Sequence, residues 1–154
     1  MFLYIFFTFL ISMSPFGEMK VGIPYAYYHD VHPLVAYVIG CVGNILIIPL
    51  VYFFLDRLNK QLMRIRSYKR MSIKIARIAK NRTGQVVKKY GFWGLIIFVG
   101  IPLPVTGAYI GTIAAWMFKM DRRRAFASIT LGVLMSGILI SLAAHTGGNL
   151  MAKF

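Results

Sequence analysis

An apolar run between residues 91 and 118 constrains the fold of this chain most strongly. Two lysines directly precede it, and Lys119 and three arginines follow it. If the run crossed a bilayer once, strong positive charge would lie on both faces, which the positive-inside rule disfavours. The run is also broken in its middle by Pro102 and Pro104. We therefore predict a re-entrant hairpin over 91–118 that enters and leaves the membrane on the cytoplasmic side.

The composition is that of an integral membrane protein rather than of a soluble domain. Of the 154 residues 58% are hydrophobic, and only 4 are acidic. The formal net charge of +14 lies beside apolar segments. It therefore indicates membrane topology and contact with anionic membrane lipid rather than nucleic acid. We expect a multi-pass protein of the cell (inner) membrane.

The first 30 residues repeat the pattern of an apolar segment, a break and a second apolar segment. About a dozen apolar residues precede the break at Ser14–Gly17, too few to span hydrocarbon as one helix. We predict a first re-entrant hairpin over 1–30. Non-helical backbone at membrane depth is tolerated only inside protein or a watery cavity, so a packed fold must enclose this break.

Two segments are long enough to span a membrane. The first covers 33–55, where a polar cap and Pro33 predict the helix start and Asn44 is expected to bond across to a neighbouring element. The second covers 124–146, where Gly132 belongs to a face of small residues suited to close packing. We predict both segments to be transmembrane helices.

Between the two halves, the segment 57–90 carries twelve positive charges and no acid. Apolar residues recur at near-helical spacing between the charges, which predicts a basic amphipathic helix on the cytoplasmic membrane surface. For 61–70 the pattern is poorer, and a solvated charged linker is an equal alternative.

The two halves have the same order of elements and opposite direction across the membrane. Each has a broken apolar segment with an Ile-Pro step and then one spanning helix. The predicted fold is thus an all-α membrane protein of two inverted repeats, each a re-entrant hairpin followed by a transmembrane helix, linked by the basic helix. Such repeats are typical of secondary transporters, whose hairpin tips meet near the midplane. The tips would bring Glu18 and Lys20 near Pro102, Pro104 and Thr106.

Two motifs resemble those of a known family. The first consists of Ser14-Pro15 with Glu18, Lys20, Gly22 and Ile23-Pro24. The second consists of Ile101-Pro102-Leu103-Pro104 with Thr106-Gly107-Ala108 and Gly111. Both are similar to motifs of the small multidrug export protein family. That family resembles the broader DedA, or SNARE-associated (VTT), membrane proteins. The resemblance implies paired re-entrant hairpins and, through the DedA relatives, transport of lipid. DedA proteins carry arginines around the second tip, which suit a phosphate group. This chain has Val99, Gly100 and Val105 there, which weakens the inference of a phosphate-bearing substrate.

Glu18 is the first candidate for a functional side chain. A carboxylate at membrane depth costs about 2.5 to 3.5 kcal/mol, so it must be protonated, paired or facing water. One interpretation is a proton-coupling carboxyl, because desolvation favours the protonated form. The other is a structural ion pair with Lys20 or a cap for the hairpin turn. Lys20 is likewise either an anion-binding group or a partner that neutralises Glu18.

The remaining candidates are architectural as well as functional. Pro24, Pro102, Pro104 and Gly107 break helices and leave backbone groups that can touch a substrate. Thr106 could donate a hydrogen bond to a substrate or to its own turn. The chain has no catalytic motif, so we expect no enzyme activity, and neither a cofactor nor a metal site.

These patterns favour a small transporter or exporter, with a lipid or amphipathic small molecule as substrate and Glu18 carrying or sensing a proton. The alternative is a non-transporting membrane assembly factor that binds anionic lipid or a protein partner through its basic segment. The small-residue faces at Gly111 and Gly132 suggest a homodimer, although they could equally be used within one subunit.

Overall fold

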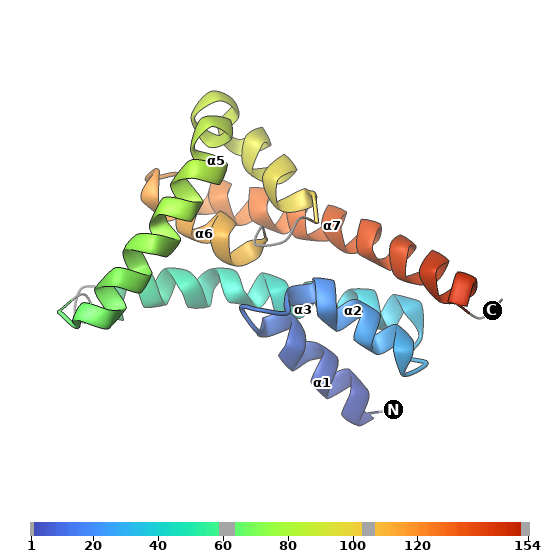
Figure 1. Ribbon diagram of the computed structural model, residues 1–154. Coiled ribbons are helices and arrows are strands. Elements are labelled where there is room, and N and C mark those ends of the chain that lie inside the picture. Colours follow the sequence, from blue (N-terminus) through green and yellow to red (C-terminus); the bar gives the residue numbers. More distant parts are fainter. Residues whose placement is uncertain (1, 59–63, 103–106, 152–154) are drawn as a thin grey trace.

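The computed structural model describes residues 2–58, 64–102 and 107–151, and every regular element in them is a helix (Figure 1). Two stretches are long and apolar enough to cross a membrane, Pro33–Leu58 and Arg122–Thr146. The all-helical class with two candidate spanning helices is therefore confirmed. The re-entrant and inverted-repeat parts of that class stay predictions.

The first hairpin consists of α1 (Phe2–Met13) and α2 (Glu18–Tyr28), which pack against each other (Figure 1). Ser14 makes the turn between them. Its hydroxyl oxygen accepts the backbone N–H groups of Phe16 and Gly17 at 3.3 and 3.1 Å, and its carbonyl accepts that of Glu18 at 3.0 Å. A serine at this point supplies partners for N–H groups of the turn that precedes α2.

Helix α3 (Pro33–Phe53) begins where the sequence predicts. Pro33 occupies its first turn, and Nδ1 of His32 accepts the backbone N–H of Leu34 at 3.3 Å. At its other end the helix widens into one π-helical turn, η1 (Phe54–Leu58). The backbone therefore stays helical as far as the polar residues that follow the apolar segment.

Helix α5 (Arg66–Gly100) turns a corner at Gly91, where φ is 52° and ψ is −117° (Figure 1). Only glycine adopts such a conformation readily. The corner divides a basic arm, residues 66–90, from an apolar continuation, residues 92–100. The predicted boundary between the basic segment and the second hairpin thus coincides with a sharp change of chain direction.

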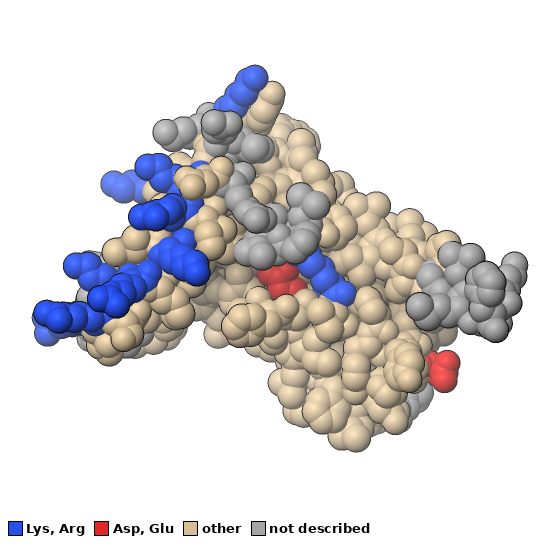
Figure 2. All heavy atoms as spheres, viewed as in Figure 1, with Lys and Arg blue, Asp and Glu red and all other residues tan. Residues whose placement is uncertain are grey.

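Lysine and arginine side chains gather along α5 (Figure 2). The arm also has an inner side, because Ala79 and Val87 are buried, and a Cβ at Gly84 would lie 3.3 Å from the ring of Phe118. The helix in this segment therefore has a buried and an exposed side, and its predicted place on the cytoplasmic membrane surface stays a prediction. Among the residues whose side chains are described, the exposed positive charges of the arm lie on Arg66, Lys69, Arg70, Lys74, Arg77, Lys80 and Lys89.

The chain continues into α6 (Ala108–Met117) and α7 (Arg122–Met151). Helix α7 contacts α2, α3, α5 and α6, so it joins the two halves of the chain. The main core includes Ile48 of α3, Val99 of α5 and Ile129 of α7. In each half two short helical pieces precede a long helix, namely α1, α2 and α3 in the first half and residues 92–100, α6 and α7 in the second.

The small residues of the second half pack inside this chain. A Cβ at Gly132 would lie 2.7 Å from Cβ of Val99 and 3.0 Å from the carbonyl oxygen of Ile96. A Cβ at Gly111 would lie 2.7 Å from Cγ2 of Val99. These two glycines allow α6 and α7 to approach α5 closely, so the faces from which a homodimer was predicted are already occupied.

We expect Gly132→Leu to destabilise the protein, because the added side chain would overlap Val99 and the backbone of α5. Overpacking of this kind costs about 1 to 3 kcal/mol. Thermal unfolding in detergent should show a lower melting temperature for Gly132→Leu than for Ala127→Leu, which adds a leucine at an exposed position of α7. Equal melting temperatures would contradict this packing.

Candidate functional site

The site is built around Glu18, whose side chain joins the first hairpin to the second. Glu18 is 7% exposed, and its carboxylate accepts the backbone N–H of Tyr109 in the first turn of α6. The N–H groups of a first helical turn have no partner within the helix, and a negative charge near them is stabilising. Glu18 therefore acts as a cap for a helix that lies about ninety residues further along the chain.

Gly107 makes room for this contact. It precedes α6 with φ of 154° and ψ of −159°, a conformation that side chains disfavour. A Cβ added there would overlap the carboxylate of Glu18. Residue 107 must therefore be glycine both for its backbone conformation and for the approach of the carboxylate.

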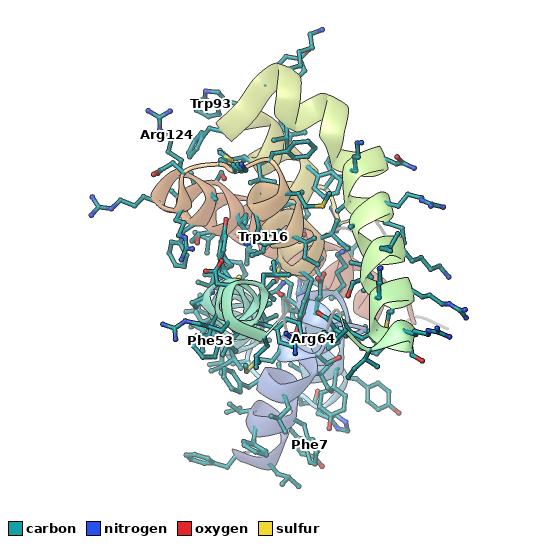
Figure 3. The ribbon with its side chains drawn as sticks, turned by 90° about the vertical axis from the view of Figure 1, so that its left-hand side faces the viewer. Phe7, Phe53, Arg64, Trp93, Trp116 and Arg124 are labelled. Atoms are coloured by element: carbon teal, nitrogen blue, oxygen red, sulfur yellow. The ribbon has the colours of Figure 1, made fainter. Side chains whose placement is uncertain are left out.

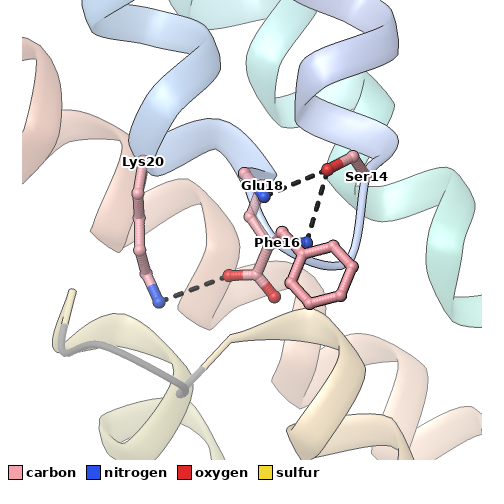
Figure 4. A network of polar contacts seen from close by, with 5 residues as sticks. Ser14, Phe16, Glu18 and Lys20 are labelled. Atoms are coloured by element: carbon pink, nitrogen blue, oxygen red, sulfur yellow. Dashed lines mark hydrogen bonds and ion pairs between the residues drawn. The ribbon is translucent and has the colours of Figure 1, made fainter.

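Lys20 neutralises the buried charge. Its Nζ lies 3.3 Å from Oε2 of Glu18, and its side chain is 20% exposed (Figure 4). An unpaired carboxylate in this position would carry a large desolvation cost, which the ammonium group and the N–H of Tyr109 offset. The ion pair with Lys20 is thus a contact of the structure, whereas the carboxylate caps the first turn of α6 and not the turn of its own hairpin.

Tyr109 ties the two hairpins together a second time. Its hydroxyl group donates a hydrogen bond to the carbonyl oxygen of Met13, the last residue of α1. Tyr109 is not among the residues predicted from the sequence. Its position two residues after Gly107, in a predicted hairpin, was the available signal, but nothing in the sequence pairs it with Met13.

An open pocket of about 430 Å³ lies beside this junction. Three residues singled out from the sequence, Lys20, Pro24 and Pro102, contribute to its lining from the two hairpins. The remaining wall comes from α7 and is aliphatic. It consists of Leu139, Ile140, Ala143 and Ala144.

The structure therefore brings most of the predicted site residues together, in two adjoining groups. Glu18 and Gly107 meet at the start of α6, and Lys20 connects them to Pro24 and Pro102 in the pocket. The predicted residues Pro104 and Thr106 lie outside the described part of the chain. The α7 wall was missed because the sequence suggested only helix packing for that segment.

Asn44 has a different environment from the one predicted. It is fully buried in α3, but neither its Oδ1 nor its Nδ2 has a hydrogen-bond partner among the described residues. The predicted bond to a neighbouring element is therefore not seen in that part of the structure. The buried hydroxyl groups of Ser12, Thr130 and Ser136 likewise have no hydrogen-bond partner among the described residues.

A family model described as "Putative small multi-drug export protein" matches residues 18–139. The chain belongs to this family. The match begins at Glu18 and includes Lys20, Gly107 and Tyr109, so the contacts of Glu18 lie within the matched part of the chain. No curated protein and no solved structure matches the chain. The relationship to the DedA proteins stays a prediction.

A double-mutant cycle tests the contact between Glu18 and Gly107. Gly107→Ala should displace the carboxylate, so the loss of stability caused by Glu18→Gln should be smaller in that background. We expect a coupling of about 0.5 to 3 kcal/mol, as for residues in direct contact. The measurement is the free energy of unfolding in detergent for the wild type, both single variants and the double variant.

Gly91→Ala is the matched control for this cycle. It also forces a side chain onto a glycine with positive φ, but no atom lies within 4 Å of the added Cβ. Its effect should add to that of Glu18→Gln without coupling. Additive effects of Gly107→Ala and Glu18→Gln would show that the contact contributes nothing to stability.

Proposed function

We propose that this small multidrug export protein moves amphipathic molecules or lipid across the membrane through the junction of its two hairpins, with Glu18 exchanging a proton. One observation carries the proposal. Lys20 takes part both in the buried ion pair with Glu18 and in the lining of the neighbouring pocket. A change in the charge of Glu18 would therefore change the electrostatic environment of Lys20 in the pocket.

Protonation of Glu18 would weaken the contacts that hold the hairpins together. A neutral carboxyl loses its attraction to Lys20 and to the positive end of α6. The contact between the first hairpin and α6 would then open more easily, and the Lys20 side chain could turn toward an acidic or polar substrate group. Return of the proton to water would restore the closed arrangement.

The pocket chemistry supports an amphipathic substrate. Apart from Lys20 its lining is aliphatic side chains and two prolines. A molecule with one polar or acidic group and a hydrocarbon part would satisfy both kinds of surface. The family name points to drug-like molecules, and the resemblance to lipid-moving proteins points to lipid.

The arrangement of the long helices supports the proposed membrane topology. Arg122 at the start of α7 forms an ion pair with Asp56 in η1, the turn that continues α3, with 2.6 Å between Nη2 and Oδ2. The start of α7 thus lies beside the end of α3, and the chain runs through the two candidate spanning helices in opposite directions. We propose that this end and the basic arm lie in the cytoplasm and that both hairpins are re-entrant, as inverted repeats require.

Transport in proteoliposomes tests the proposal with two substrates, ethidium and a fluorescent phosphatidylglycerol. Wild-type protein should move at least one of them faster when a pH gradient is imposed. Glu18→Gln keeps a hydrogen-bond acceptor but cannot ionise. It should lower the gradient-driven rate by about tenfold or more, the effect of removing one charged hydrogen-bond partner.

Asp30→Asn is the matched control, because Asp30 is an exposed acid at the far end of the same hairpin. It should keep the wild-type response to the gradient. Identical rates for Glu18→Gln and the wild type would refute proton coupling. Absence of transport of either substrate by the wild type would favour the assembly-factor alternative, in which the charges of the basic arm are essential.

A further inference from the structure

A second pocket, of about 560 Å³, lies where the end of α3 meets the start of α7. It shares no lining residue with the pocket beside Glu18. Three arginines, one aspartate and a set of apolar and aromatic side chains surround it. The lining residues are Pro49, Tyr52, Phe53, Asp56, Arg57, Arg122, Arg123 and Phe126.

Both carboxylate oxygens of the aspartate in this pocket already accept hydrogen bonds. Oδ1 of Asp56 accepts the indole N–H of Trp116 at 3.1 Å, from a side chain that α6 contributes (Figure 3). Oδ2 of Asp56 accepts a hydrogen bond from Arg122 at 2.6 Å. The guanidinium group of Arg122 also lies over the ring of Tyr52, 5.6 Å from its centroid. Asp56 and Arg122 thus largely compensate each other's charge.

Two arginines remain to set the charge of the pocket. Arg57 and Arg123 are exposed, and neither forms an ion pair with an acid among the described residues. The nearby acid Asp121 is also exposed, and its Oδ1 accepts the backbone N–H of Arg124 at 3.0 Å. Guanidinium groups bind phosphate oxygens well because their N–H groups form a planar fork. An anion carrying a phosphate group is therefore the ligand that these charges suit.

The rest of the lining is apolar. Phe53 is 61% exposed and Phe126 is 42% exposed, and both belong to the stretches that are long enough to span a membrane. Aromatic and basic residues together at the ends of spanning helices are typical of the membrane–water interface. A free phosphate ion would contact the arginines but would leave these rings in water.

We propose that this pocket binds the headgroup of an anionic phospholipid, with Arg57 and Arg123 at the phosphate and the acyl chains along Phe53 and Phe126. The site lies at the common end of α3 and α7, so a bound lipid would brace the two spanning helices there. The proposal does not depend on transport. It differs from general attraction of the basic arm to the membrane because it assigns binding to two named arginines outside that arm.

Native mass spectrometry of the full chain in a neutral detergent tests the proposal, with phosphatidylglycerol, phosphatidylcholine or inorganic phosphate added. Wild-type protein should retain phosphatidylglycerol in preference to the other two. The double variant Arg57→Gln/Arg123→Gln should bind phosphatidylglycerol about 30-fold more weakly, since each cation near an anionic membrane surface contributes about a factor of five. Arg122 stays unchanged so that the contact with Asp56 is kept.

Arg70→Gln/Arg77→Gln is the matched control, because it removes the same charge from exposed positions of the basic arm. It should retain phosphatidylglycerol as the wild type does. Equal losses in the two double variants would overturn the proposal in favour of diffuse attraction. Unchanged binding by Arg57→Gln/Arg123→Gln, or binding of inorganic phosphate as tight as that of the lipid, would also overturn it. Far-ultraviolet circular dichroism of each variant checks that the helices are intact.

Discussion

The rest of the structure depends on the need to compensate one buried carboxylate. Glu18 lies at the tip of the first hairpin, where an unpaired charge could not stay. It is satisfied by Lys20 and by the first turn of α6, so the tips of two segments far apart in the sequence are held together. The same contact requires glycine at position 107 and directs Lys20 to the edge of a pocket. Fold and candidate site are thus consequences of one electrostatic constraint.

The sequence predicts the parts of this structure that depend on local signals. Pro33 after a polar cap predicts the start of α3. The change of composition at residue 91 predicts a boundary there, but not the corner that α5 makes at Gly91. A lone acid beside a lysine in an apolar segment identifies Glu18 as a candidate. Tyr109 and the α7 wall of the pocket could not be predicted, because their roles arise from contacts between elements about a hundred residues or more apart. For Asn44 too, the sequence could place the residue in an apolar helix but could not predict which groups would surround its side-chain amide.

Helix α7 connects the two pockets. Arg123 lies at one pocket and Ile140 at the other, and seventeen residues of helix between them correspond to about 25 Å at 1.5 Å per residue. One pocket is therefore at the end of a candidate spanning helix and the other lies far along it. A lipid that braces the ends of α3 and α7 would therefore act far from the hairpin junction beside Glu18.

The central claim is that residues 91–118 enter and leave the membrane on one side. The two helical pieces of this hairpin, residues 92–100 and α6, are each about 15 Å long or less, about half of the hydrocarbon thickness. The most direct test replaces Cys41, the single cysteine of the chain, by serine and introduces single cysteines at Lys89, Lys119 or His145. Labelling of intact cells with a membrane-impermeant maleimide should leave Lys89→Cys and Lys119→Cys unmodified and modify His145→Cys. Modification of only one of the first two would show that this segment crosses the membrane and would contradict the account.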